Sequence, residues 1–350
     1  MRILTTLRKG CFCALGVLVL SCSRAASDPR DTPPRASVKL EQHRAVPPKA
    51  ASHYVADLRF IARPRPHGSP HWQKVQDRCA HVFRQAGMQT RLQRYATGVN
   101  VIGERPGTTL ADELVIVSAH YDSVANCAGA DDNASGVAGV LELARRIPPR
   151  PRPRTLLLAC WDQEEEGLLG SRAFVASLEG RVHAHFTLEM IASASDEPNT
   201  QRIPEGLQLL FPSQVEDVRR NRSRGNFIAV IADAGSAHAA GAFGQHARAL
   251  ALPVMRLDVP KELEQSDATG HLRRSDHDAF WSAGLPSVML TDTAEFRNPA
   301  YHCSRRQDEL AGLNADFATK VVSATAEAVE ALLGTAPLPS VDAIVHAEGG

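Results

Sequence analysis

Three consecutive carboxylates, Glu164, Glu165 and Glu166, follow directly on an apolar run that spans residues 155–161. Such a short apolar run is typical of a buried strand. Adjacent like charges at the end of a buried strand repel one another and resist burial. The three acids must therefore be solvated, as the first turn of a helix would allow, or face a positive charge. What the rest of the chain brings to the same place decides between these alternatives.

Other apolar runs end in similar side chains. Histidines and acids stand at or just beyond the ends of four runs: His120 after 114–119, Glu164 and Glu165 after 155–161, Glu189 within 186–190, and His302 one loop after 286–291. Asp131 begins the helix expected after the first of these loops. In open α/β sheets, ligands bind outside the carboxyl ends of the strands. We therefore expect these side chains to gather at one edge of a sheet.

Imidazole nitrogens and carboxylate oxygens are ligands of zinc, and a catalytic zinc site keeps one position open. Asp131, Glu165 and Glu189 carry three negative charges, which two Zn²⁺ and one hydroxide balance. In two-metal sites the ions lie roughly 3.5–4 Å apart, so a carboxylate must bridge them. We predict that Asp131 is this bridge. Asp122, two residues beyond His120, is expected to accept the other imidazole N–H and so fix the tautomer.

The elements that must position these residues alternate between strands and helices of ten or more residues. This alternation predicts an α/β fold, a three-layer sandwich with a mixed, mostly parallel sheet and helices on both faces. The expected strands are 88–95, 100–104, 114–119, 155–161, 183–190, 226–233 and 286–291. The expected helices include 71–86, 137–147, 171–178, 236–250 and 314–333. Residues 192–225 are interpreted as an irregular insertion, and residues 51–334 as one domain.

The N-terminal residues 1–22 are interpreted as a signal peptide. A positive segment precedes an apolar stretch, residues 11–20, that is too short to span a bilayer. Residues 18–22 resemble the bacterial lipobox, in which Cys22 would be lipidated, and an ordinary signal peptide is the alternative. Residues 23–50 are expected to form a disordered tether, and 335–350 a flexible tail. We therefore expect a protein of the bacterial envelope, lipid-anchored or periplasmic, or a secreted one.

Composition narrows the range of partners. The formal net charge of the full chain is zero, with 39 basic and 39 acidic residues. Removing residues 1–21 takes away three basic residues and no acidic ones, which leaves 36 basic residues against 39 acidic. Nothing in this balance suggests a nucleic acid partner. Membrane contact is expected only through the lipid, and the oligomeric state cannot be derived.

Four of the seven cysteines lie outside the signal segment: Cys79, Cys127, Cys160 and Cys303. In an exported chain they allow three disulfide pairings. Cys127 and Cys303 each lie near a predicted metal ligand, so a disulfide between them is one hypothesis. The alternative is that they are small buried hydrophobic residues.

The ordered motifs resemble those of the M28 zinc peptidases, a family of co-catalytic zinc aminopeptidases and their carboxypeptidase and glutaminyl cyclase relatives. The matching segments are His120-x-Asp122, Gly129-x-Asp131-Asp132-Asn133-x-Ser135-Gly136, Glu164-Glu165-x-Gly167-Leu168-x-Gly170-Ser171, Leu188-Glu189-Met190-Ile191 and Tyr301-His302. The resemblance covers residues 51–334 and implies the zinc-dependent exopeptidase fold. It also implies that the substrate is a peptide, and it favours an aminopeptidase.

The resemblance assigns roles to individual residues. Asp131 would bridge two zinc ions, Glu165 and His302 would complete one of them, and His120 and Glu189 the other. Glu164 would be the general base, and Tyr301 would donate a hydrogen bond to the oxyanion of the tetrahedral intermediate.

One position departs from the best-known aminopeptidases, which have Asp where Glu189 stands. If Glu189 did not bind metal, the site would hold one zinc, as in a glutaminyl cyclase, which is the alternative function. That branch has Trp at the position of Tyr301 and lacks the Asp-Asp-Asn-x-Ser-Gly segment, so both features favour a peptidase. A non-catalytic binding protein is disfavoured because all the ligands and the base are present. The choice between aminopeptidase and carboxypeptidase, and the preferred side chain, stay open; the specificity pocket is expected in 192–225 and 233–275.

Overall fold

The computed structural model describes residues 48–334. The predicted signal peptide, the lipobox cysteine and the tail therefore lie outside the described residues. The predicted tether does too, except for residues 48–50, which open the first helix. Among the described residues, no helix combines the length and the apolar character needed to cross a membrane.

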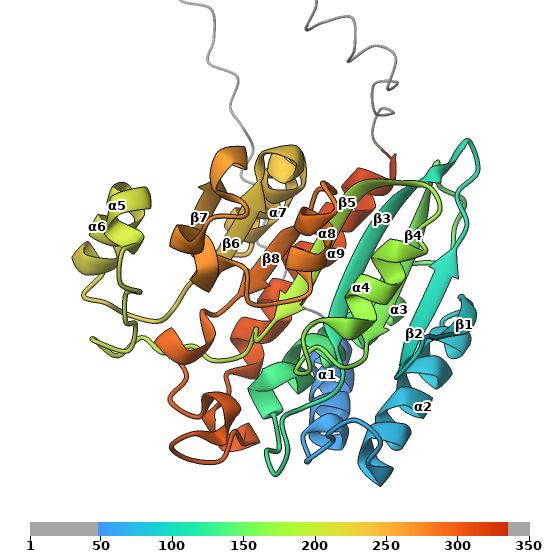
Figure 1. Ribbon diagram of the computed structural model, residues 1–350, viewed down its shortest axis with the longest axis horizontal. Helices are drawn as coiled ribbons and strands as arrows, with labels where there is room; N and C mark the ends of the chain where they lie inside the picture. Colours follow the sequence, from blue (N-terminus) through green and yellow to red (C-terminus); the bar gives the residue numbers. More distant parts are fainter. Residues whose placement is uncertain (1–47, 335–350) are drawn as a thin grey trace, which may run out of the picture. The chain divides into compact units, whose positions relative to one another are not determined.

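Eight strands form one mixed sheet (Figure 1). They are β1 (Gln89–Arg94), β2 (Val99–Arg105), β3 (Leu110–His120), β4 (Arg154–Trp161), β5 (Arg181–Glu189), β6 (Ile228–Asp233), β7 (Val254–Val259) and β8 (Val288–Thr291). Their order is β1-β2-β4-β3-β5-β8-β6-β7. The four central strands, β4, β3, β5 and β8, run parallel, while β2 and β6 pair antiparallel at their flanks. The carboxyl ends of the central strands therefore meet at one edge.

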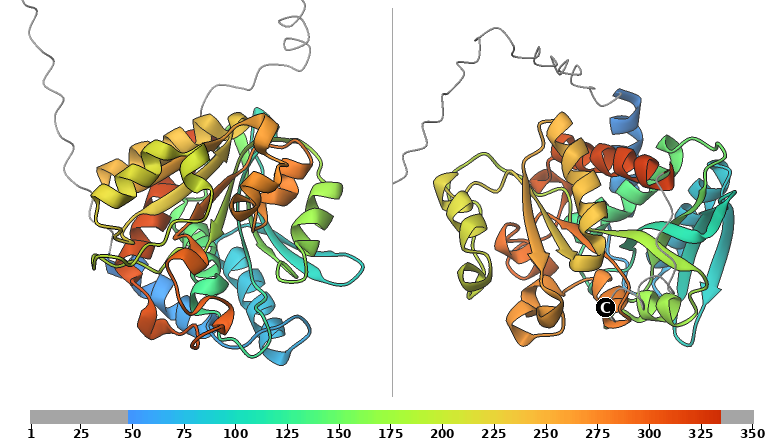
Figure 2. Two further views of the ribbon diagram at one scale, coloured as in Figure 1. Left: turned by 60° about the vertical axis from the view of Figure 1, so that its left-hand side comes forward. Right: turned by 90° about the horizontal axis from the view of Figure 1, so that it is seen from above.

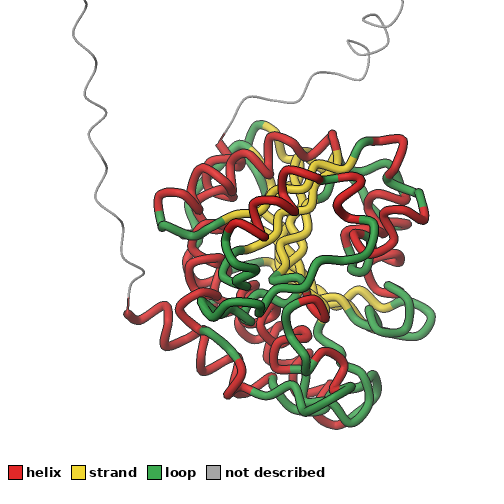
Figure 3. Tube along the Cα trace, turned by 90° about the vertical axis from the view of Figure 1, so that its left-hand side faces the viewer, coloured by secondary structure: helices red, strands yellow, loops and turns green. Residues whose placement is uncertain are grey.

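Helices cover both faces of the sheet, as predicted (Figures 2 and 3). The apolar cluster on one face includes residues of α1 (Pro48–Ile61), α2 (Pro70–Gln85), α3 (Gly136–Arg146), α7 (Ala237–Ala249) and α9 (Ala315–Gly334). The other face packs against α4 (Leu169–Ala176) and α8 (His277–Ser282), and farther along against α5 (Leu207–Leu210) and α6 (Pro212–Arg220). The α/β sandwich is confirmed.

Burial explains why the central strands have no polar alternation. Every residue of β4 is buried, because the strand lies between parallel or antiparallel neighbours and has helices on both faces. Trp161 and Phe174 pack against each other on one face, with ring centroids 4.7 Å apart. This packing fixes the end of β4, from which the acid-rich turn leaves.

Two parts of the fold differ from the prediction. Strand β7 was not expected, because it lies at the sheet edge and its sequence includes the charged Arg256 and Asp258 among half-buried residues. The segment 192–225 is not wholly irregular, since it contains α5 and α6. Helix α6 begins with Pro212 and buries only Val215 and Val218, so its apolar face is too narrow to be recognised in a polar sequence.

Acid should destabilise the fold through the buried His277, the first residue of α8. Its Nε2–H donates to the carbonyl of Leu272 at 2.7 Å, and its buried Nδ1 has no hydrogen-bond partner. Burial lowers the pKa of His277 from 6.5 to about 4. The unfolded chain then binds more protons than the folded one between pH 6.5 and 4, so stability is lost as pH falls through that window. A shift of this size corresponds to about 3 kcal/mol.

This expectation is tested on metal-free protein, so that the release of zinc at low pH does not contribute to the loss of stability. We expect the free energy of unfolding in urea to fall more steeply from pH 6.5 to 4 in the wild type than in His277→Gln, whose amide can still donate to Leu272. Equal pH dependence of the two proteins would contradict the assignment.

Candidate metal centre

The carboxyl ends of the central strands bring four of the predicted ligands together. His120 is the last residue of β3, Glu189 is the last residue of β5, and Glu165 lies in the turn after β4. His302 comes from the loop after β8. His120 Nε2 lies 3.5 Å from Glu189 Oε2, and His302 Nε2 lies 3.2 Å from Glu165 Oε2. These are the two His–Glu pairs expected for two metal positions.

Asp132, and not Asp131, lies between the two pairs. One carboxylate oxygen of Asp132 is 3.3 Å from His120 Nε2, and the other is 3.3 Å from His302 Nε2. One carboxylate thus reaches both imidazoles with different oxygens, which is the arrangement that a bridging ligand requires. The structure therefore places Asp132, rather than the predicted Asp131, between the two imidazoles.

Asp131 is directed away from the metal centre. Its Oδ1 accepts from the N–H of Ala192 at 3.1 Å, and its Oδ2 accepts from Asn298 Nδ2 at 2.9 Å. The reason is the local backbone, since Asp132 and Asn133 have non-helical φ and ψ within the turn that precedes α3. The chain therefore does not enter the helix at Asp131 as predicted, and the two adjacent carboxylates make separate sets of contacts.

The charges at this site favour bound cations. Burial alone would lower the pKa of His120, but the charges of Glu189 and Glu164 outweigh it and hold the pKa well above its usual value. The pKa of His302 rises to about 10 because its interactions with the carboxylates of Asp132 and Glu165 outweigh partial burial. The negative charges around the two imidazoles thus favour their protonated, positively charged form. A dication can supply the same positive charge.

Unsatisfied polar atoms support this fit. His120 Nε2, Asp132 Oδ2 and Glu165 Oε1 are buried and have no hydrogen-bond partner. Ligand atoms of His120, Asp132 and Glu165 lie within 4.8 Å of one another, and so do those of His120, Glu164 and Glu189. Buried polar groups are normally paired, so atoms of zinc-ligating types left unpaired at one place fit a zinc centre.

Asp122 supports the centre from behind. One of its oxygens lies 3.3 Å from His120 Nδ1. The same carboxylate accepts the backbone N–H groups of Glu164 at 3.1 Å and Glu165 at 3.2 Å. Asp122 therefore connects the β3 imidazole to the acid-rich turn, a wider contact than the sequence predicted.

Glu164 and Glu165 occupy different surroundings, although they are adjacent. Burial raises the pKa of Glu164 well above its usual value, with an opposing effect from His120 and a further increase from Glu189. Glu165 faces His302, as described above. Glu166 is exposed and accepts from Gln163 Nε2 at 2.8 Å. The three adjacent acids therefore have three different surroundings.

Tyr301 lies beside the metal centre with its ring stacked on His302, the ring centroids being 3.8 Å apart. Its phenol oxygen accepts from Arg274 Nη2 at 2.9 Å, and the guanidinium group cannot accept in return. The phenol hydrogen therefore stays available for another acceptor. Arg274 is in turn paired with Glu295, so the tyrosine is held from the outside.

Several supporting residues were not assigned a role from the sequence. Glu189 Oε2 accepts from Ser275 Oγ at 2.7 Å and from Asn133 Nδ2 at 3.1 Å. Arg65 is fully buried and donates to backbone carbonyls, including those of Gly129 and Asp132. Asn133 lies within the Gly129–Gly136 motif and Ser275 at the end of the range expected for the specificity pocket, whereas no local signal marks Arg65.

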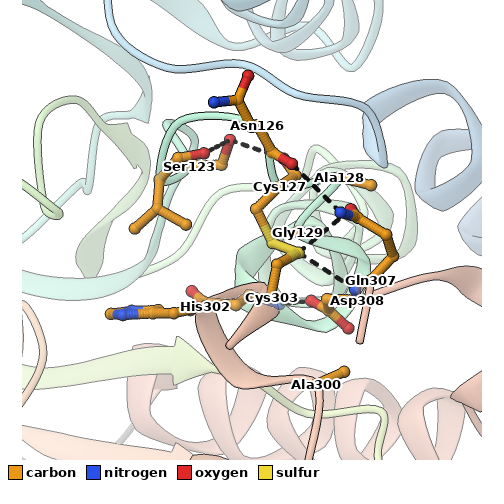
Figure 4. The surroundings of a disulfide bond; sticks show 12 residues. Ser123, Asn126, Cys127, Ala128, Gly129, Ala300, His302, Cys303, Gln307 and Asp308 are labelled. Carbon is orange, nitrogen blue, oxygen red and sulfur yellow. Dashed lines mark hydrogen bonds and ion pairs between the residues drawn. A yellow bond between two sulfur atoms is a disulfide. The ribbon is translucent and has the colours of Figure 1, made fainter. Parts of the chain in front are cut away.

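A disulfide joins Cys127 to Cys303, as one sequence hypothesis stated (Figure 4). Cys79 and Cys160 are buried free thiols. Figure 4 shows that the disulfide links the loop after β3 to the loop that carries His302. The other hypothesis, that these cysteines are unpaired hydrophobic residues, is wrong for Cys127 and Cys303.

A largely apolar pocket opens beside the centre, with Glu189 and Tyr301 among its lining residues. Apolar side chains from the expected segments and from the sheet line it, among them Ile203, Leu207, Ile231, Met255, Leu257 and Met289. Arg202, Arg274 and Glu295 also contribute to its lining. The pocket can hold an apolar group next to the metal centre.

Comparison with known proteins identifies the family. The model of peptidase family M28 matches residues 100–329. The chain belongs to peptidase family M28. This M28 chain is 34% identical over 207 residues to the uncharacterized protein YfbL of Escherichia coli, a match that covers 54% of this chain and 58% of YfbL.

Other M28 relatives carry functional names. The chain is 30% identical over 228 residues to the probable lipoprotein aminopeptidase LpqL of Mycobacterium tuberculosis, covering 62% of this chain and 38% of LpqL. The chain thus spans less than two thirds of either of these curated relatives. The crystal structure of BSAP, a zinc aminopeptidase from Bacillus subtilis, superimposes with a TM-score of 0.62 at 15% identity, covering 82% of this chain and 96% of that one. This likeness shows the shared fold.

Proposed function

We propose that the protein is an exported zinc aminopeptidase that removes N-terminal residues from peptides. The observation that carries this proposal is the Asp132 carboxylate lying 3.3 Å from both His120 and His302, each of which is paired with its own glutamate. His120 and Glu189 would hold one zinc, His302 and Glu165 the other, and Asp132 both. Bound zinc ions polarise the scissile carbonyl and lower the pKa of water.

The chain's own residues carry out the remaining steps. Glu164 takes a proton from the attacking water and returns it to the leaving amine, a role suited to a half-buried carboxyl with a raised pKa. Arg274 donates a hydrogen bond to the phenol oxygen of Tyr301 and cannot accept one. The phenol hydrogen is therefore free to bind the oxygen of the tetrahedral intermediate. The apolar pocket binds the side chain of the residue that is removed.

An apolar pocket favours medium to large apolar side chains, since a charged side chain would lose its hydration there. The aminopeptidase name of the relative LpqL agrees with this proposal.

The test is a panel of aminoacyl chromogenic substrates assayed with and without a chelator. We expect leucyl and methionyl substrates to be cleaved at least ~10-fold faster, by kcat/KM, than aspartyl substrates, because burying an unpaired charge costs several kcal/mol. N-acetyl-leucyl substrate is the matched control and should not be cleaved. Zinc should restore the activity that the chelator removes. Cyclisation of N-terminal glutamine with one zinc per chain would instead support the cyclase alternative.

Export is part of the same proposal. A disulfide forms and persists in oxidising compartments, so the Cys127–Cys303 bond agrees with the signal peptide expected in residues 1–22. Anchoring through a lipid on Cys22 is the narrower proposal. Metabolic labelling with a palmitate analogue, compared between wild type and Cys22→Ala, tests it.

A further inference from the structure

The disulfide connects two loops that carry metal-ligand candidates. Cys127 lies in the loop between β3 and Asp132, and Cys303 directly follows His302. The bond closes a separation of 176 residues, with the two Cα atoms 5.5 Å apart (Figure 4). The bond therefore fixes the distance between the β3 loop and the His302 loop at a point next to the metal centre.

The Cys127 end of this connection is firmly held. Cys127 is almost fully buried, and its carbonyl accepts from Ser123 Oγ at 3.3 Å. Ser123 Oγ in turn accepts from the backbone N–H of the buried Arg65 at 3.0 Å. The Arg65 side chain also donates to the carbonyl of Ala128 at 2.7 Å. The loop around Cys127 can thus serve as a fixed anchor.

The Cys303 end reaches the backbone of Asp132 through Asp308. The backbone N–H of Asp308 donates to Cys303 Sγ at 3.3 Å. The Asp308 carboxylate accepts the backbone N–H groups of Asp131 at 2.8 Å and Asp132 at 3.0 Å. The disulfide and this carboxylate therefore hold the two loops together at two points.

His302 needs such support more than His120 does. The His120 side chain is 1% exposed and ends a central strand, whereas the His302 side chain is 36% exposed and lies on a loop. His302 and Cys303 both have positive φ values, 52° and 54°. Residues other than glycine keep this conformation only where surrounding contacts determine it. The disulfide is a covalent contact at this point.

We propose that the Cys127–Cys303 disulfide positions His302 for metal binding. Zinc binding by His302 and Glu165 then depends on the disulfide, whereas zinc binding by His120 and Glu189 does not. The inference rests on the proposed zinc centre. It predicts that breaking the disulfide weakens zinc binding at the His302 position by about 10–100-fold, the usual effect of losing an outer contact to a ligand.

The test compares the wild type with Cys127→Ser/Cys303→Ser in full-length protein. Zinc affinities are measured by competition with a chromogenic chelator, so that the readout does not depend on peptide cleavage. We expect one affinity to fall about 10–100-fold and the other to stay within about twofold. Cys79→Ala, which removes a buried free thiol far from this loop in sequence, is the control and should bind zinc like the wild type.

Two further variants assign the weakened position. In a Glu189→Gln background, removing the disulfide should weaken the remaining zinc, and in a Glu165→Gln background it should not. Unchanged zinc affinities in the double serine variant would overturn the proposal. An equal fall in affinity at both positions, together with a lower midpoint of thermal unfolding, would also overturn it, because it would indicate a general stabilising role for the disulfide. A wild type that binds one zinc would contradict the two-metal proposal. In that case, a lower affinity for this zinc after removal of the disulfide would support the positioning role, and an unchanged affinity would overturn it.

Discussion

Replacing Glu164 with glutamine should lower kcat by about 10²–10⁴-fold, the usual contribution of a general base, while both zinc ions stay bound. The glutamine keeps the size of the side chain but cannot take a proton from the attacking water. Glu164 lies with His120 and Glu189 in the metal cluster, and burial raises its pKa well above the usual value. A carboxyl at this place can take the proton of the attacking water and pass it to the leaving amine. The kinetics of a leucyl substrate and the zinc content per chain are the two measurements.

Glu166→Gln is the matched control for this variant. Glu166 is the third acid of the same turn, is exposed, and contacts Gln163 rather than the centre. We expect its kcat to stay within about twofold of the wild type, as is usual for surface substitutions. A Glu164→Gln enzyme that turns over as fast as the Glu166→Gln enzyme would exclude Glu164 as the base.

Asp132→Asn should abolish the shared metal site, whereas Asp131→Asn should leave it in place. Asp132 is the only carboxylate among the described residues that is paired with both His120 and His302. The asparagine variant lacks a negative charge that two dications would share. We therefore expect zinc affinity to fall by more than the ~10–100-fold that is typical when a residue supporting a metal ligand is lost. Activity should fall with it.

The neighbouring Asp131 offers a close control because it is equally buried and one residue away. Burial and the charge of Asp308 raise the pKa of Asp131 to about 7, so a neutral side chain is already partly populated there. Its asparagine variant leaves one donor without an acceptor, which costs about 1–3 kcal/mol of stability. Zinc titration of both variants separates the two roles. Loss of zinc from Asp131→Asn with retention in Asp132→Asn would contradict the site described here.

The sequence predicted the site at the level of strands better than at the level of single residues. His120 and Glu189 end buried parallel strands, and the carboxyl ends of such strands meet at one edge whatever the loops do. Asp131 and Asp132 belong to a turn, where two adjacent identical residues have no periodicity to separate them. The contacts that do separate them come from Ala192, Asn298 and Asp308, which are distant in the sequence.

The same distinction explains the errors in the fold. Central strands such as β4 are buried on both faces and have continuous apolar sequences, so they were predicted nearly to their ends. The edge strand β7 is half exposed, and its charged residues are tolerated because only part of it packs against the rest of the protein. Contacts such as that of Arg65 with the metal-centre loop depend on the assembled fold and leave no local pattern in the sequence.

The central claim is that one aspartate, Asp132, holds two zinc ions between two His–Glu pairs. Anomalous diffraction at the zinc absorption edge, from crystals grown with zinc, measures this most directly. We expect two peaks roughly 3.5–4 Å apart, one next to His120 and Glu189, the other next to His302 and Glu165, with Asp132 touching both. A single peak, or a peak coordinated by Asp131, would contradict the account.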